Sequence, residues 1–320
     1  MTTARTVPVT TEMDGDELDA EDAWHLARRH GLRHVVVSSF VRFRYGDGFT
    51  NSRALALQTC LAVVPFMLAV TGLAADIDDD RWARVVAATV NAIAPGQGTN
   101  DALAAAAGGS ERSGEIALTF GLLFALVSMT TAMAQVERGT NRIYGIRRDR
   151  PALHKYGRAA VFTVVLAAPV GLGFLLLVGG GAFGDAMVAE GVWTETAEDW
   201  WDWVRWPLGV AMLVFAIAVL LDHAPRRRQP ALSWLALGSG TAVALSAVAT
   251  GGLAAYVSLS ASFSSTYGPL AGVFVLLLWS LLSSMAFFYG AAVCAQLEAL
   301  RAGDDQPAYD DPGRPHRQTV

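Results

Sequence analysis

Long uninterrupted apolar blocks recur along the chain, separated by polar segments. Most blocks have about 19 to 25 residues, enough for a helix rising 1.5 Å per residue to cross a hydrocarbon core of about 30 Å. A soluble chain of this length would carry its apolar residues in shorter, interrupted runs. The pattern predicts an all-α fold, a polytopic membrane protein with a bundle of six transmembrane helices. The expected spans are about 54–75, 116–134, 159–181, 203–221, 234–257 and 269–293.

Polar segments flank this membrane domain, which we expect to occupy residues 21–300. Residues 1–20 form an acidic segment and residues 301–320 a polar one, and both are predicted to be disordered tails. The first 20 residues contain no apolar stretch, so the first span rather than a cleaved signal peptide is expected to direct insertion. Residues 24–45 mix arginines with apolar side chains, which favours an N-terminal helix lying in the membrane interface.

The basic residues indicate the orientation of the bundle. Of the 24 lysines and arginines, all but four lie before the first span, after the last, or in the loops that follow spans two and four. The exceptions are Arg81, Arg84, Arg112 and Arg205. Because basic residues concentrate on the cytoplasmic side of a membrane, both termini are predicted to be cytoplasmic.

The end of the second span carries the most informative polar residues, in the stretch MAQVERGTNRIYGIRRDRP. Gln135, Arg138 and Arg142 recur at i, i+3 and i+7, on one face of a helix. With Gln58 and Asn141, they are the expected substrate-binding residues, lining a cytoplasmic mouth. Amides and planar guanidinium groups suit the phosphate or carboxylate of an anionic, lipid-like substrate. The alternative for such groups is interhelical hydrogen bonding with a purely structural role.

The same stretch yields two further expectations. Arg147, Arg148 and Arg150 should act only as topology charges near the anionic headgroups. Glu137 should pair with Asn141, four residues later on the same helix.

Two other patterns predict packing rather than chemistry. Small residues recur at every fourth position of the fifth span, which predicts close approach by a neighbouring helix; they are Gly238, Ala242, Ser246, Thr250 and Ala254. A cluster of tryptophans in the outer loop before the fourth span is typical of an aromatic belt at headgroup level; its members are Trp193, Trp200, Trp201, Trp203 and Trp206.

Three stretches carry a resemblance to a known family: ALALQTCLAVVPFML, ERGTNRIYGIRRDRP and STYGPLAGVFVLLLWSLLSSMAFFYGAAVCAQLEAL. Their order and spacing resemble the YihY/BrkB family of bacterial inner-membrane proteins, formerly labelled ribonuclease BN. The resemblance implies six helices, cytoplasmic termini, a multi-pass location in the bacterial plasma membrane and, for some members, movement of lipid-like molecules. The chain departs from the family pattern at Leu57, Ala62, Leu221 and Ala292, the last standing where a glutamate is usual.

Motifs for catalysis are absent from the sequence. His30 and His34 are four residues apart but lie among arginines, without a carboxylate nearby in the sequence, and no phosphate-binding loop or serine nucleophile elbow occurs. We therefore expect no catalytic residue, no bound metal, no cofactor and no nucleic-acid partner, and ribonuclease activity is not favoured. Membrane lipids are the expected partners. Two functions remain open: transport or flipping of an anionic lipid-like substrate, and a non-transporting scaffold for envelope integrity.

Overall fold

Long helices make up most of the structure, a computed structural model that describes residues 5–12, 18–75, 80–93, 111–259 and 271–310. Among the described residues, five helical segments are long and apolar enough to cross a membrane. They are Thr119–Ile143, Ala152–Ala189, Glu195–His223, Leu232–Leu259 and Ala271–Arg301. The second to sixth expected spans lie within or overlap these segments. The first expected span lies within helix α3 (Gly48–Ala75), part of whose side chains lie outside the described residues.

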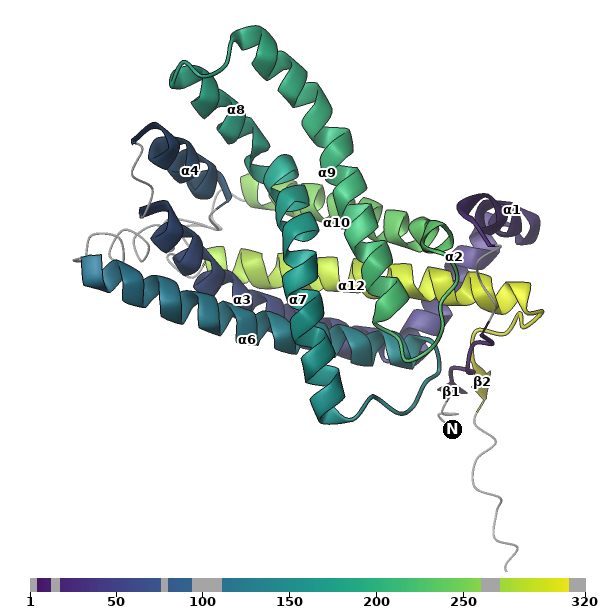
Figure 1. Ribbon diagram of the computed structural model, residues 1–320. Coiled ribbons are helices and arrows are strands. Elements are labelled where there is room, and N and C mark those ends of the chain that lie inside the picture. The colour runs from purple at the N-terminus through teal and green to yellow at the C-terminus, as the bar shows by residue number, and fades with distance from the viewer. Residues whose placement is uncertain (1–4, 13–17, 76–79, 94–110, 260–270, 311–320) are drawn as a thin grey trace, which may run out of the picture.

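The helices form two sets that cross each other (Figure 1). Helices α3, α6 (Glu111–Ile143) and α12 (Ala271–Arg301) run side by side, with α3 packed between α6 and α12. Helix α10 (Leu232–Leu259) packs against α12, and the α7–α9 pair crosses the set at a steep angle, with α7 resting on α6. Helix α9 spans Glu195–His223, and α4 (Asp80–Ile93) packs against α8 (Gly180–Ala189) at the other end of the molecule.

Local signals in the sequence explain several helix ends. The Asp19 carboxylate accepts hydrogen bonds from the first turn of α1 (Ala20–His30), a typical N-cap. Gly31, with φ of +88°, then separates α1 from α2 (Leu32–Tyr45), so the expected interfacial helix over 24–45 is two helices. Pro151 precedes α7 (Ala152–Phe174), and the Thr194 side chain caps α9.

The third expected span is longer in the structure than the sequence pattern indicates. A π-helical turn, η1 (Leu175–Gly179), joins α7 to α8 without a break, so the helical segment runs from Ala152 to Ala189. Pro169 lies inside α7, as Pro207 does inside α9. Each proline removes one backbone hydrogen bond while the apolar helix continues around it.

Small residues allow α10 and α12 to approach closely, as the four-residue repeat predicts. A Cβ atom built on Gly238 would lie 2.2 Å from the Cys294 Sγ atom and 2.5 Å from the Gly290 carbonyl oxygen. Further along the same face, Trp279 of α12 donates its indole N–H to the Thr250 hydroxyl at 3.0 Å. The small-residue face of α10 therefore packs against α12 at these positions.

The tryptophans around the start of α9 divide into two groups. Trp193 and Trp201 pack around Phe183, with ring centroids 5.4 to 5.6 Å apart. Trp200, Trp203 and Trp206 are 71%, 81% and 52% exposed on α9, as expected for rings that meet a lipid headgroup region.

The hydrophobic core is densest where the C-terminal half of α12 meets α2, the end of α6 and the start of α10. All residues from Ala286 to Leu300 are buried except Tyr289. The N-terminal segment 5–12, which we term the strap, runs across this end of the bundle. Its strand β1 (Arg5–Thr6) pairs antiparallel with β2 (Tyr309–Asp310), so described parts of both terminal segments lie together.

Candidate functional site

The amides predicted to line a mouth tie α3 to α6. The Gln58 side-chain oxygen accepts a hydrogen bond from the Thr131 hydroxyl at 2.8 Å. The Gln135 amide donates to the Asn51 side-chain oxygen, also at 2.8 Å. Both bonds cross between the two helices, and both glutamines are half-buried rather than directed to solvent. This arrangement fixes the relative position of α3 and α6 where α6 enters its arginine-rich end.

Asp149, in the loop after α6, gathers the polar groups of that end. Its carboxylate accepts hydrogen bonds from Arg138 at 3.2 Å, Asn141 at 3.2 Å and Lys155 at 3.1 Å. Lys155, the single lysine of the chain, is 6% exposed, so the loop holds it against the carboxylate. Two of the predicted site residues, Arg138 and Asn141, therefore share one acidic partner, which the helix periodicity could not identify.

Two opposing effects set the pKa of Asp149. Burial by itself would raise it, but the hydrogen bonds from Lys155, Asn141 and Arg138 lower the pKa below the ordinary value for an aspartate. The carboxylate is therefore ionised at neutral pH and holds the loop in place.

Asn141 links this loop to the one between α9 and α10. Its side-chain oxygen accepts a hydrogen bond from the Arg226 backbone N–H at 2.8 Å, and the residue is fully buried. Arg142, the last member of the predicted set, instead donates to the Arg147 carbonyl oxygen at 3.0 Å. The five predicted site residues thus lie along the α3–α6 contact and the end of α6, each with a hydrogen-bond partner in the protein.

Two expectations for this stretch differ from the structure. Glu137 pairs with Arg150, at 3.2 Å, and not with Asn141. Arg150 also donates to the carbonyl oxygens of Ala224 and Pro225 at 3.0 Å. A planar guanidinium can reach three acceptors in different directions, so Arg150 joins the end of α6 to the end of α9. It is more than a topology charge.

A second polar cluster, which the sequence pattern missed, lies buried beneath the strap. The Glu298 carboxylate of α12 meets the Arg227 guanidinium at 2.8 Å and accepts a hydrogen bond from the Tyr144 hydroxyl at 3.1 Å. Arg227 also stacks over the Tyr144 ring, 4.7 Å from its centroid. Burial and the neighbouring Glu298 raise the pKa of Tyr144, so its hydroxyl stays protonated and donates.

Arg42 is the other cation of this buried cluster. Its guanidinium donates to the Gln296 side-chain oxygen at 3.2 Å, the Thr10 hydroxyl at 2.6 Å and the Ile143 carbonyl oxygen at 3.3 Å. Burial lowers the pKa of Arg42 to about 10, which still leaves it charged at neutral pH. The one available sequence signal was the pair Gln296 and Glu298 at the end of an otherwise apolar span.

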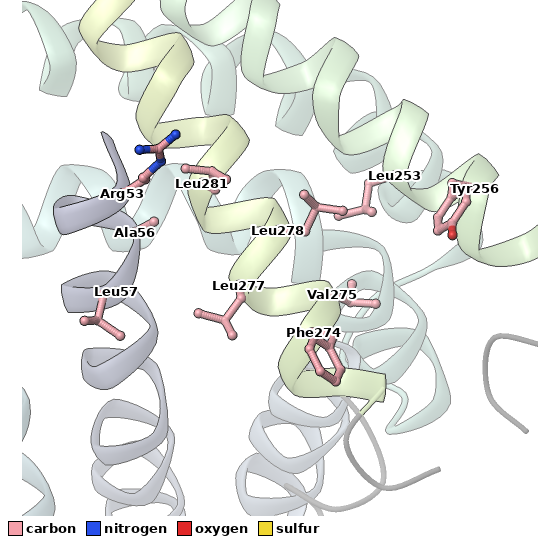
Figure 2. Close-up of a pocket in the computed structure, with 10 residues that line it drawn as sticks. All are labelled: Arg53, Ala56, Leu57, Leu253, Tyr256, Phe274, Val275, Leu277, Leu278 and Leu281. Carbon is pink, nitrogen blue, oxygen red and sulfur yellow. The ribbon is translucent and has the colours of Figure 1, made fainter. Parts of the chain in front are cut away.

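An apolar groove opens between α3, α10 and α12, on the side of α3 that faces away from α6 (Figure 2). It has a volume of about 460 Å³, and nearly all its lining is aliphatic or aromatic. Arg53, the only charged residue among the described residues of the lining, lies at the α3 end, whereas Phe274 and Tyr256 lie toward the other end (Figure 2). The remaining lining residues are Ala56, Leu57, Leu253, Val275, Leu277, Leu278 and Leu281. The groove thus combines a long apolar wall with one cation.

Among the described residues, no three His, Cys, Asp or Glu side chains form a group that could hold a metal ion. His34, which lacks an acidic neighbour in the sequence, lies 2.6 Å from the Asp305 carboxylate in the structure.

Comparison with known proteins places the chain in a family. A family model described as virulence factor BrkB matches residues 39–313. The chain belongs to the virulence factor BrkB family. The family resemblance drawn from the three sequence stretches is therefore confirmed.

The relatives are bacterial proteins, several of them named as membrane proteins. A ribonuclease-like protein, YfkH, of Bacillus subtilis (strain 168) is 24% identical over 284 residues, which cover 84% of this chain and 97% of that protein. A UPF0761 membrane protein of Stenotrophomonas maltophilia (strain K279a) is 26% identical over 295 residues, 89% of this chain and 66% of the relative. One from Pseudomonas paraeruginosa is 30% identical over 185 residues, 57% of this chain and 42% of the relative.

No solved structure shows a significant match to the chain. The chain spans about two thirds or less of the length of the UPF0761 relatives. Its family and its apolar helices together identify a multi-pass membrane protein of a bacterial family.

Proposed function

We propose that this protein binds an anionic, lipid-like amphiphile and moves it between the leaflets of the bacterial plasma membrane. The observation that carries the proposal is the apolar groove with Arg53 at one end. Its volume of about 460 Å³ lies within the range of roughly 300 to 1,000 Å³ that small-molecule sites occupy. An acyl chain would lie along the aliphatic wall while the charged headgroup meets the arginine.

The state of Arg53 supports this assignment. Its side chain is exposed, and within the part of the chain that the structure describes it makes no ion pair. Arginine binds phosphate and carboxylate oxygens through two parallel N–H groups, which makes it the preferred residue for such headgroups. Because no carboxylate among the described residues holds Arg53, its guanidinium is available to meet an incoming headgroup.

The proposal includes a finer topology. Helix α3 forms the first of six transmembrane spans, and both termini lie in the cytoplasm, as the distribution of arginines predicts. Helices α1 and α2 lie in the inner interface. In support, α2 exposes Leu32, Val36, Val37 and Phe40 next to its arginines, a composition suited to the headgroup region.

Gln58, Gln135, Arg138, Asn141 and Arg142 are proposed to border the cytoplasmic mouth of the path. Arg138 is the member best suited to meet a substrate, since its side chain is 55% exposed while Asp149 holds it in place. Arg138→Lys should reduce activity because an ammonium cannot form the same fork, whereas Arg148→Lys, at an exposed arginine nearby, should leave activity unchanged.

The deciding experiment is reconstitution of the full chain into liposomes with fluorescent lipid probes. Wild-type protein should accelerate redistribution of an anionic probe, and Leu278→Trp, which fills the groove, should slow it about tenfold or more. Val248→Trp is the matched control, because Val248 lies on α10, is 73% exposed and does not line the groove. Arg53→Gln should slow the anionic probe more than a zwitterionic one.

Absence of redistribution for every lipid tested would reject transport and favour the scaffold function. The same preparation addresses the ribonuclease-like name of the Bacillus subtilis relative. Metal-dependent RNA cleavage that a single substitution abolishes would replace the transport proposal.

A further inference from the structure

The strap covers a buried cation that lacks an acidic partner. Arg42 is 0% exposed, and within the described residues no carboxylate lies within ion-pair distance of it. Its three hydrogen-bond acceptors are neutral oxygens, and its second terminal nitrogen has no partner among the described atoms. Buried charges in proteins are normally paired or bound to a ligand of opposite charge, so this arrangement is unusual.

The neighbouring cation has unused donors as well. Arg227 meets Glu298, but its Nε and one terminal nitrogen are buried without a hydrogen-bond partner. The amide nitrogen of Gln296, whose side-chain oxygen accepts from Arg42, is also buried and unpartnered. Several unsatisfied N–H donors thus lie around two buried guanidinium groups, a combination that an anionic acceptor would satisfy.

The strap supplies oxygen atoms to both arginines. The Thr10 hydroxyl accepts from Arg42 at 2.6 Å, and the Thr11 carbonyl oxygen accepts from Arg227 at 3.0 Å. The strap is also held by the Thr10 backbone N–H to the Tyr144 carbonyl oxygen, by the two-residue β1–β2 pairing, and by Arg5, which pairs with Asp310 and lies over the Tyr45 ring. These few contacts at the edge of the bundle make the strap the element that can leave without unpacking a helix.

We propose that Arg42 and Arg227 form a binding site for a phosphate-class oxyanion, and that the N-terminal strap occupies this site in competition with the anion. The Thr10 hydroxyl and the Thr11 carbonyl stand where two oxygens of the anion bind. Glu298 neutralises Arg227 in part, so Arg42 contributes the main attraction. Displacement of the strap opens a cytoplasmic entrance above the ends of α6 and α12.

This site is separate from the groove of the proposed function, because none of its residues lines that groove. The oxyanion has two sources with the same chemistry, free inorganic phosphate and the headgroup of an anionic lipid. The site would make the position of the strap respond to either one.

The test uses the full-length protein purified in detergent and titrated with inorganic phosphate, with thermal stability as the readout. Phosphate should raise the Tm of wild-type protein, and Thr10→Val should bind phosphate about tenfold more tightly. In this variant the strap lacks its hydrogen bond to the charged Arg42, and the loss of one such bond corresponds to about a tenfold change in affinity. Arg42→Gln should abolish the response. Arg44→Gln, at an exposed arginine on the same helix, should leave it unchanged.

A second measurement does not depend on a variant that folds poorly. Hydrogen exchange of residues 5–12 in wild-type protein should become faster when phosphate is added, because the Thr10 N–H loses its bond to the Tyr144 carbonyl. Exchange that is unchanged or slower would overturn the proposal. An equal phosphate response in wild type and Arg42→Gln would also overturn it, as would unaltered affinity in Thr10→Val.

Nanodiscs distinguish the two sources of the anion. If phosphatidylglycerol nanodiscs, compared with phosphatidylcholine ones, speed strap exchange in wild type but not in Arg42→Gln, the lipid headgroup occupies the site. If only added phosphate speeds strap exchange, and does so in both kinds of nanodisc, free phosphate is the ligand. Failure of lipid transport with intact phosphate binding would reject the proposed function while leaving this site standing.

Discussion

The Arg227 guanidinium and the Glu298 carboxylate lie 2.8 Å apart, and their side chains are only 2% and 0% exposed. They come from the loop between α9 and α10 and from the last turns of α12, so the pair fastens two separate parts of the bundle end. A buried pair of this kind contributes little net stability, yet removing one partner leaves the other charge uncompensated.

Arg227→Met should therefore lower the free energy of unfolding by about 3 to 5 kcal/mol. The double variant Arg227→Met/Glu298→Leu should recover much of this loss, because no charge then remains buried alone. Chemical denaturation in detergent measures both. Arg5→Gln breaks a pair whose side chains are 43% and 63% exposed and should cost at most about 1 kcal/mol. Additive losses in the double variant would show that the two residues do not interact.

Asp149 predicts a specific dependence of stability on pH. Its pKa is lower in the folded protein than its ordinary value of about 3.9, so the ionised carboxylate stabilises the fold above that pH. This contribution is lost as the pH falls through the lowered pKa. Asp149→Asn should have a lower Tm than wild type at neutral pH, and the difference should shrink below about pH 4. Asp199→Asn, at an exposed aspartate of α9, is the control. A deficit that stays constant down to the lowest pH would assign the effect to shape rather than charge.

Arg150 and Arg148 separate structural arginines from topology charges. Arg150→Lys loses contacts with Glu137 and the Ala224 and Pro225 carbonyls, so it should destabilise the fold by about 1 to 3 kcal/mol. Arg148 is exposed, and Arg148→Lys should change stability by no more than about 0.5 kcal/mol. Thermal denaturation of the two variants side by side makes the comparison. If Arg150→Lys is as stable as Arg148→Lys, Arg150 acts only as a topology charge.

Two glycines of α10 test the close approach to α12. Gly238→Ala places a methyl group against Cys294 and the Gly290 backbone and should destabilise the protein by about 1 to 3 kcal/mol. Gly240→Ala meets nothing within 4 Å and should stabilise α10 by up to about 1 kcal/mol, because alanine favours the helix. Denaturation curves with changes of opposite sign would support the packing. If Gly240→Ala destabilises the protein instead, a surface from another molecule packs against this face of α10.

The sequence alone determined the parts of this protein that a membrane dictates. Lipid requires each span to satisfy its own backbone and to have a minimum apolar length, so five spans could be located from composition along the chain. The repeat that begins at Gly238 predicted a close helix neighbour for a similar reason, since helices in lipid associate through small residues.

Only the tertiary structure decided which polar side chains meet. Periodicity placed Gln135, Arg138 and Arg142 on one face, but their partners Asn51, Asp149 and Arg147 lie on another helix or in a loop. Arg42 and Gln296 are 254 residues apart, and no local pattern connects them. Such pairs form because helix packing brings distant segments together and burial then forces each polar group to find an acceptor, a condition that the order of residues along one helix does not contain.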